Sequence, residues 1–377
     1  MQDRGYTMAA GPLRIHVIDR EMFSARAEMR MWDDPVGLLD IGDRQRSAML
    51  ASPFSAGPRT PMRLVAEQAG RVVGKGEFLP GRIWIGKQPH AVNWAAGLVV
   101  DPAYRGQGIA TALDRKRRAI SQVFGACGAS VAHARIYRRL GFHEVSRQRY
   151  VRPCRARPVV RRYLGDHPAA KVLTPLAEAA LATGRRAVAM LAPPRPRGLT
   201  LQPAGALPAD LEPIVNGPSA FIRTDRSCPW FEWVLTHQFH PDPGNRQALH
   251  LVVEPDRQPV AWMLTRVRFH ERASHRGFPD TLLGSVGDWG ILEPRRLTWM
   301  GLLQLACDVL EGCGCDAIEC CLPPGHRTRG LMRRLGFVPL GKLYGFMHFA
   351  LGLGVDVGAH PPRTWAIRAA DGDHFVS

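Results

Sequence analysis

The sequence predicts an α+β protein made of two tandem domains of one kind, each a mixed, mainly antiparallel sheet with helices on both faces. The 377 residues exceed the roughly 250 to 300 at which a single hydrophobic core usually splits. A run of β-rich segments followed by an amphipathic helix occurs twice, in the same order. The segment 137–142, YRRLGF, recurs as MRRLGF at 332–337, each copy ending a helix and starting a strand. Such a repeat indicates two copies of one unit.

In the first copy, alternation over 13–18 predicts a strand, and 21–32 reads as a helix. Three β-rich runs then predict an antiparallel meander, at 63–68, 72–79 and 92–100. After a glycine-rich turn, apolar residues at helical spacing predict a helix from Ile109 to Phe124. A second helix over 134–140 ends at Gly141, and the chain returns to a strand over 142–151.

Prolines, arginines and an Ala-rich helix over 176–191 mark a connecting segment. Beyond it, further β-rich runs rebuild the meander, at 199–202, 249–254, 260–267 and 282–292. An amphipathic helix follows over 298–310. The predicted organisation is therefore a first domain at 1–153, a linker with a helix at 154–198 and a second domain at 199–377.

The formal net charge of +17 should attract anions at long range. Only five of the 50 basic residues are lysines, however, and the arginines are spread over the whole chain. No signal peptide or membrane-spanning run is readable, which favours a cytoplasmic protein without a membrane partner. Eight cysteines in such a chain favour reduced thiols.

The segment Leu98 to Thr111 carries the main chemical signal. It places a strand (Leu98, Val99, Val100) before Asp-Pro, then the loop Arg105-Gly106-Gln107-Gly108 and a helix opening with Ile109, Ala110 and Thr111. Glycines at a strand-to-helix turn let backbone N–H groups converge on a pyrophosphate, and the helix N-terminus adds partial positive charge. Arg105 and Thr111 can add hydrogen bonds from their side chains.

This segment resembles the acetyl-CoA loop of the GCN5-related N-acetyltransferase (GNAT) family, whose pattern is matched by Arg105, Gly108 and Ala110. The resemblance covers about 13–153. It implies tandem GNAT domains, acetyl-CoA as cofactor, and transfer of an acetyl group to an amine. In the same family a tyrosine on the late helix often protonates the departing CoA thiolate, and Tyr137 takes that position. The alternative for Tyr137 is a helix residue that packs beside the cofactor.

The first copy departs from the family pattern at two places. Asn93 and Trp94 stand where many members carry a catalytic Glu; Glu77, His90 and Glu144 are the substitutes. The segment 125–131, GACGASV, is shorter and weaker than the strand expected there, and that strand helps to split the sheet.

The second copy lacks both parts of the site. Glu293 to Trp299 has no Gly-x-Gly, and Met332 replaces the tyrosine. We therefore expect a degenerate domain that shapes or covers the active cleft.

Two weaker signals have structural explanations. Cys313, Cys315, Cys320, Cys321 and His326 do not show the spacing of a known metal knuckle, and small buried residues explain them. Between residues 147 and 162 there are seven arginines and no acidic residue, but no aromatic interleaving. A strand edge and linker explain this segment better than a nucleic-acid surface, so we expect neither a metal site nor nucleic-acid binding.

The sequence thus favours an acetyl-CoA-dependent N-acetyltransferase whose acceptor is a small-molecule or protein amine. Two alternatives stay open: a non-catalytic acyl-CoA-binding module, and an anion-binding interaction protein that has lost the cofactor.

Overall fold

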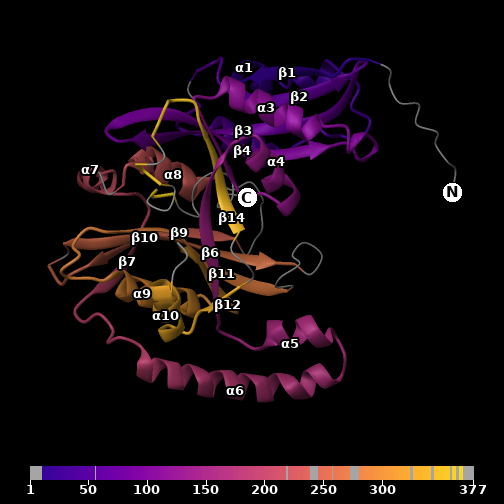
Figure 1. Cartoon of the computed structure of the whole chain (residues 1–377). Coiled ribbons are helices and arrows are strands. Elements are labelled where there is room, and N and C mark those ends of the chain that lie inside the picture. The colour runs from indigo at the N-terminus through magenta and orange to yellow at the C-terminus, as the bar shows by residue number, and fades with distance from the viewer. Residues whose placement is uncertain are drawn as a thin grey trace.

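The computed structural model describes the chain from Gly11 onward, as residues 11–55, 57–217, 220–237, 245–256, 258–271, 280–322, 326–340, 344–356, 359–361 and 365–367. It confirms the predicted α+β class. Two mainly antiparallel sheets lie one above the other and are joined through one shared strand into a continuous 14-stranded order, and a hairpin of two helices lies at the lower edge of the molecule (Figure 1).

The first half, here the elements β1 to β6, supplies most strands of the first sheet. Its strands are β1 (Arg14–Asp19), β2 (Pro61–Gln68), β3 (Arg71–Ile85), β4 (Gln88–Val100), β5 (Val123–Cys127) and β6 (His143–Pro153). β2, β3 and β4 form the predicted antiparallel meander, and β1 pairs antiparallel with β2, whereas β4 and β5 pair in parallel.

Helices cover both faces of this sheet. They are α1 (Arg20–Ser24), η1 (Ala27–Arg30), α2 (Asp43–Leu50), η2 (Pro102–Tyr104), α3 (Ile109–Ile120) and α4 (Val131–Arg139). The predicted helix at 21–32 is thus two short pieces. The left-handed Arg26, with φ of 55°, lies between them, because this backbone conformation cannot continue a helix.

The connecting segment forms two helices, α5 (Arg157–Leu164) and α6 (Ala169–Leu191), where one was predicted. Gly165, with φ of 58°, ends the first of them. The 23-residue α6 runs along the lower edge of the molecule (Figure 1).

The second half, the elements β7 to β14, repeats the order of the first. Its elements are β7 (Thr200–Ala204), η3 (Ala209–Leu211), α7 (Glu212–Val215), β8 (Ile222–Thr224), α8 (Cys228–Thr236), β9 (Arg246–Val253), β10 (Pro259–His270), β11 (Thr281–Ile291), α9 (Trp299–Gly312), β12 (Ala317–Leu322), α10 (His326–Arg334), β13 (Val338–Pro339) and β14 (Tyr344–Leu351). Here β11 and β12 form the parallel pair, as β4 and β5 do in the first half.

The two halves exchange their last strands. β14 lies between β5 and β6 in the first sheet, where Phe349 is opposite Gly125 and His143. β6 in turn continues into the second sheet, where Glu319 of β12 pairs with Val151 (Figure 1). Each sheet therefore contains a strand from the other half.

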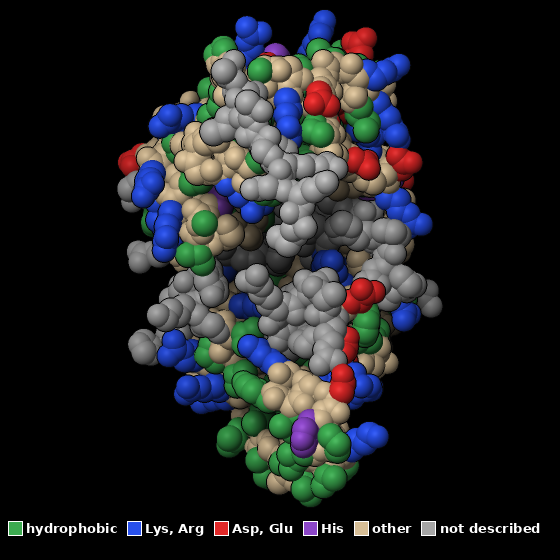
Figure 2. Space-filling model, turned by 90° about the vertical axis from the view of Figure 1, so that its right-hand side faces the viewer, with side chains coloured by type: hydrophobic (Ala, Val, Ile, Leu, Met, Phe, Trp, Pro, Cys, Tyr) green, Lys and Arg blue, Asp and Glu red, His purple; other side chains and the backbone are tan. Residues whose placement is uncertain are grey.

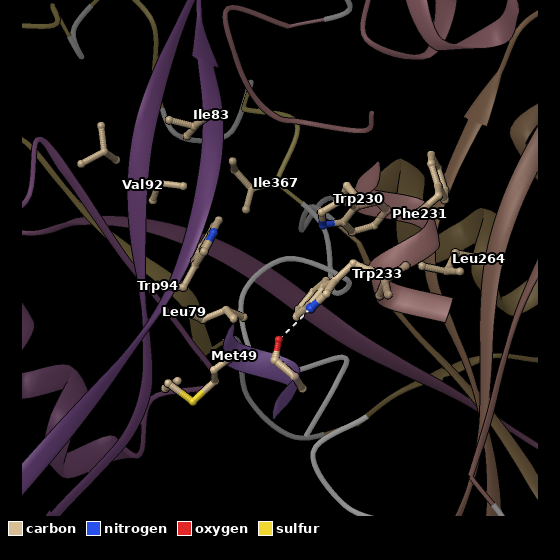
Figure 3. Close-up of a cluster of buried hydrophobic side chains, with 14 of the residues drawn as sticks. Met49, Leu79, Ile83, Val92, Trp94, Trp230, Phe231, Trp233, Leu264 and Ile367 are labelled. Atoms are coloured by element: carbon tan, nitrogen blue, oxygen red, sulfur yellow. Dashed lines mark hydrogen bonds between the residues drawn. The ribbon is translucent and has the colours of Figure 1, made fainter. Parts of the chain in front are cut away.

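One hydrophobic core spans both halves. Leu79 and Trp94 from the first half share it with Phe231 and Leu264 from the second. Figure 3 shows these side chains meeting between the two sheets, with the Trp233 indole N–H donating to the Ala48 carbonyl at 2.8 Å. The two halves therefore share a hydrophobic core and are not joined by a polar surface contact.

On the face shown in Figure 2, Lys and Arg are spread from top to bottom. Of the seven arginines between 147 and 162, five bond to groups elsewhere in the chain: Arg147 to the Trp365 and Ile367 carbonyls, Arg149 to Glu319, Arg152 to Glu311, Arg155 to Asp316 and Arg161 to Asp280. These pairs tie the chain segments together, as expected of a strand edge and linker.

Candidate active site

The first sheet opens where β4 and β5 separate. Their paired residues are Val92–Trp94 and Val123–Gly125, and the remaining six residues of β4 run on beyond this stretch. A β-bulge lies in the same part of β4: Gly97, with φ of 65°, falls between the residues that pair with Gly76 and Glu77. Bulges bend a strand and strengthen its twist, so β4 turns away from β5 here. Leu98, Val99 and Val100 form the last part of β4, past the bulge.

Asp101 fixes the turn that leaves β4. Its carboxylate accepts from the Ala103 N–H at 2.9 Å and from Arg71 at 3.2 Å, while its own N–H donates to Val73 O. The single turn η2 follows and buries Tyr104. The loop is therefore anchored to the sheet before the glycines begin.

The glycines of the loop are required by backbone conformation. Gly106 and Gly108 have φ of 83° and 82°, a region that residues with a Cβ rarely adopt. A Cβ placed on either would meet nothing within 4 Å, so the space in front of the loop is open. Arg105 and Gln107 are exposed beside them.

The N-terminus of α3 lies directly behind this space. Gly108 is its N-cap, no side chain caps it, and the first bond to the cap carbonyl comes from Ala112. The N–H groups of Ile109, Ala110 and Thr111 therefore have no acceptor within the helix. Together with the helix dipole they make a site for an anionic group, and phosphate is the usual ligand of such sites.

Tyr137 lies in the core between α4 and the sheet. It is 2% exposed, and its ring contacts the rings of His133, Phe142 and Phe124 at centroid distances of 4.6, 4.7 and 6.4 Å. His133 is held in turn by Asp114 of α3, with 2.6 Å between Nε2 and Oδ2. Packing therefore fixes the ring on three sides.

Of the three substitute bases, Glu77 lies closest to the bulge. A Cβ on Gly97 would come within 2.6 Å of its Oε2. Its Oε1 pairs with Lys75 at 2.9 Å and with Arg63 at 3.2 Å, and all three side chains are buried. Burial lowers the pKa of Lys75, and the negative charge of Glu77 opposes that shift. Glu77 thus has a structural role in a buried ion-pair network.

The other two candidate bases, His90 and Glu144, lie further from the bulge in β4. His90 is opposite Ile83, near the tip of the β3–β4 hairpin. Glu144 is on β6, separated from β5 by β14, and pairs with Arg138 at 2.9 Å.

Residues of the second half cover the face of the first sheet opposite α3. The motifs of the first half could not predict that these residues contribute to the site. α8 brings Trp230 and Trp233 against Leu79 and Trp94 (Figure 3). A small crevice of about 20 Å³ remains there, room for about one water molecule, and Asp225 lines it. The sequence does carry a signal from which the start of α8 could be predicted. Ser227 stands at the N-cap, and Cys228-Pro229-Trp230 forms the first turn.

The equivalent helix start in the second half is closed. Thr298 caps α9, its hydroxyl accepting from Gly301 N–H at 3.2 Å. A Cβ on Gly301 would come within 2.8 Å of Pro196 and 2.9 Å of Leu297, so both side chains cover the first turn.

The cysteine-rich segment belongs to the core of the second half. Cys307, Cys315 and Cys320 are buried in it, and burial raises the pKa of Cys315 to about 12. Such thiols stay protonated at neutral pH, whereas metal binding requires thiolates. In the described part of the chain no three His, Cys, Asp or Glu side chains are grouped for a metal ion. The side chain of His326 lies outside the described residues.

Two comparisons with known proteins agree with this geometry, and a third finds nothing. Residues 63–144 match the family model of the acetyltransferase (GNAT) domain, a segment that includes the loop, α3 and α4. No curated protein sequence matches the chain significantly.

In the described ranges, no helix has both the length and the apolar character needed to cross a membrane.

Solved structures with the same fold cover nearly the whole chain. A GCN5-related N-acetyltransferase from Anabaena variabilis superposes with a TM-score of 0.53 at 12% identity, over 90% of this chain and 73% of that chain. The N-myristoyltransferase of Saccharomyces cerevisiae with bound myristoyl-CoA gives 0.55 at 11% identity, over 97% and 87%. A probable N-acyltransferase from Enterococcus faecalis gives 0.50 at 10%, over 90% and 72%. At these identities the likeness shows the fold.

Proposed function

We propose that the chain is an acetyl-CoA-dependent N-acetyltransferase acting on an amine, a proposal that starts from the match of residues 63–144 to the family model of the GNAT domain. The observation that carries the proposal is the open, glycine-built loop in front of the uncapped N-terminus of α3, next to the point where β4 leaves β5. We also propose that the first domain ends at residue 153 and that the linker ends at residue 198.

The residues of the loop suit the pyrophosphate of CoA. The free N–H groups of Ile109, Ala110 and Thr111 point along the helix axis toward the open space, and Gly106 and Gly108 keep that space clear. Arg105 and Gln107 lie exposed beside it and can add hydrogen bonds to phosphate oxygens. Leu98, Val99 and Val100 would run alongside the pantetheine arm, with their backbone groups available to it.

Bound acetyl-CoA would supply an activated acetyl thioester. In the proposed reaction, backbone N–H groups near Val99 and Val100 donate hydrogen bonds to the thioester carbonyl and so favour attack by the amine. Tyr137 gives its proton to the leaving sulfur.

The amine would approach from the face that α1, α2 and α8 cover. The second half then lines this side of the acceptor's path, through Trp230, Trp233 and Asp225, around the crevice that has room for about one water molecule. This is the role proposed for 199–377, a domain that has lost its own cofactor site. A small-molecule amine and a protein amine are both compatible with it.

Titration calorimetry with acetyl-CoA tests the loop. We expect wild type to bind and Gly108→Asp to lose binding, because a carboxylate there repels the pyrophosphate and a Cβ strains a backbone with φ of 82°. Gly198→Asp is the matched control: its φ is 70°, its Cβ would also meet nothing within 4 Å, and it lies in the linker. Unchanged binding in Gly108→Asp would disprove the loop assignment.

A free-thiol assay over a panel of amines then tests catalysis. Release of CoA that depends on an amine supports the transferase. Binding without release identifies an acyl-CoA-binding module, and no binding at all identifies an anion-binding protein. The same assay with acetyl-, octanoyl- and myristoyl-CoA decides the acyl group.

A further inference from the structure

We propose that the cavity between α6 and the helices α9 and α10 is a binding site for a small anionic amphiphile, a molecule with an apolar chain and a carboxylate or phosphate group. The cavity has a volume of about 560 Å³, within the range of about 300–1,000 Å³ typical of small-molecule sites. It lies between the linker helix α6 and the second half, separate from the loop of α3, and the proposal does not depend on the acetyltransferase activity.

The walls of the cavity are largely apolar. α6 contributes Leu181 and Val188, the segment after it contributes Pro193, and Leu335 closes the opposite side. Gly184 lies between the two α6 residues, and a Cβ there would meet nothing within 4 Å. The helix therefore leaves the middle of the cavity open, where an apolar chain could be buried.

Arginines line the same cavity. Arg152 and Arg185 both pair with Glu311, the former at 2.6 Å, and Arg195 pairs with Asp308 at 3.0 Å. Arg334, the fourth arginine in the lining, is exposed and has no acidic partner among the residues that the structure describes.

Four guanidinium groups thus face two carboxylates, so the cavity has an excess of positive charge. A guanidinium beside an apolar wall can bind a carboxylate or phosphate through two parallel hydrogen bonds. Arg334 is the group available for it, and an anionic head with an apolar chain satisfies both features of the site.

Calorimetry with three single-chain probes tests the site, the two charged probes being used below their critical micelle concentrations and the alcohol below its solubility limit. Decyl phosphate and decanoate should bind with a stoichiometry of one, and the uncharged decanol at least about tenfold more weakly. The two charged probes distinguish a phosphate ester from a fatty acid as the ligand class. Absence of saturable binding by both would overturn the proposal.

Variants with matched controls locate the binding. Gly184→Trp should fill the cavity and weaken decyl phosphate binding by about tenfold or more. Ala182→Trp, two residues away on the exposed opposite face of α6, should not change it. Arg334→Glu should weaken binding while its neighbour Arg333→Glu, exposed but outside the lining, leaves it within about twofold.

Circular dichroism and thermal unfolding confirm that each variant is folded. Folded Gly184→Trp that binds decyl phosphate like wild type would show that the cavity is not the site. If Gly184→Trp does not fold, Leu181→Phe takes its place as the cavity-filling change.

Discussion

The environment of Tyr137 permits two roles for one side chain. Its ring is fixed by His133, Phe124 and Phe142, as a structural residue would be. It also lies on α4 next to β5, the strand that forms one side of the opening in the first sheet. Rigid packing and proton donation do not exclude each other, because a fixed phenol is also a well-oriented one.

Tyr137→Phe separates the two roles, since it keeps the ring and removes the proton. If the hydroxyl protonates CoA, turnover should fall by about 10²-fold or more while acetyl-CoA affinity barely changes. Steady-state kinetics and calorimetry on the same preparation measure both. An equal loss of rate and affinity would make Tyr137 a packing residue.

His143 makes stability depend on pH. Burial, followed by the positive charge of Arg118, lowers the pKa of this imidazole below its ordinary 6.5. Below pH 6.5 the unfolded chain therefore binds more protons at this site than the folded chain, so the stability falls as the pH falls until the folded-state pKa is passed.

Urea unfolding of His143→Gln should therefore show a smaller loss of stability between pH 7.5 and 5 than wild type does. His90→Gln, which removes an imidazole from the remote β3–β4 hairpin, is the control. An unchanged pH dependence in His143→Gln would contradict the assignment.

At the scale of elements, β5 is the strand on which the first sheet depends. It pairs with β4 on one side and with β14 on the other. The sequence predicted a weak, shortened strand from the small residues at 125–131, whereas the structure has a strand over Val123–Cys127. Gly125 is small because Trp94 and Phe349 cross over it, and a Cβ there would come within 2.7 Å of one and 3.0 Å of the other.

Gly125→Ala should accordingly lower the free energy of unfolding by about 1–3 kcal/mol, since neither aromatic ring can move without opening the core. Gly184→Ala is the opposite case, because α6 has open space at that position. There the better helix propensity should raise stability by up to ~1 kcal/mol. Equal urea midpoints for both variants would refute the packing argument.

The elements that sequence could predict are those with a regular apolar pattern. The meander strands and α3 lie close to their predicted ranges. α2 was missed because one of its buried side chains is Arg46, which pairs with Glu28 and breaks the apolar periodicity. The partner of β5 was not predictable either: Phe349 lies 224 positions beyond Gly125, and no local pattern encodes that pairing. In the candidate site, the glycine loop could be predicted from the sequence. The packing of α8 against the first sheet could not be predicted, because it depends on contacts between the two halves.

For the whole molecule, the two halves keep one fold and differ at their helix starts. α3 begins with an uncapped N-terminus behind two glycines, whereas α9 begins with Thr298 bonded to its own first turn and covered by Pro196. Arg296 of the second half pairs with Glu254 at 3.5 Å.

The expected stoichiometry is therefore one acetyl-CoA per chain. Without a backbone cradle, Arg295 and Arg296 could hold a phosphate only by charge, and such binding is negligible at ~0.15 M salt. Titration at that ionic strength decides the matter. Two sites of similar affinity, or one site that survives Gly108→Asp, would place the working domain elsewhere.

The exchange of β6 and β14 also constrains how the chain is made in the cell. The first sheet has a gap between β5 and β6 until Tyr344–Leu351 has been synthesised. At translation rates of ~5–20 residues per second, the stretch from Pro153 to Tyr344 takes about 10–40 s. During that interval the nascent chain carries two unpaired strand edges. We therefore expect the first half to associate with ribosome-bound chaperones and to complete its folding only after Tyr344–Leu351 has been synthesised.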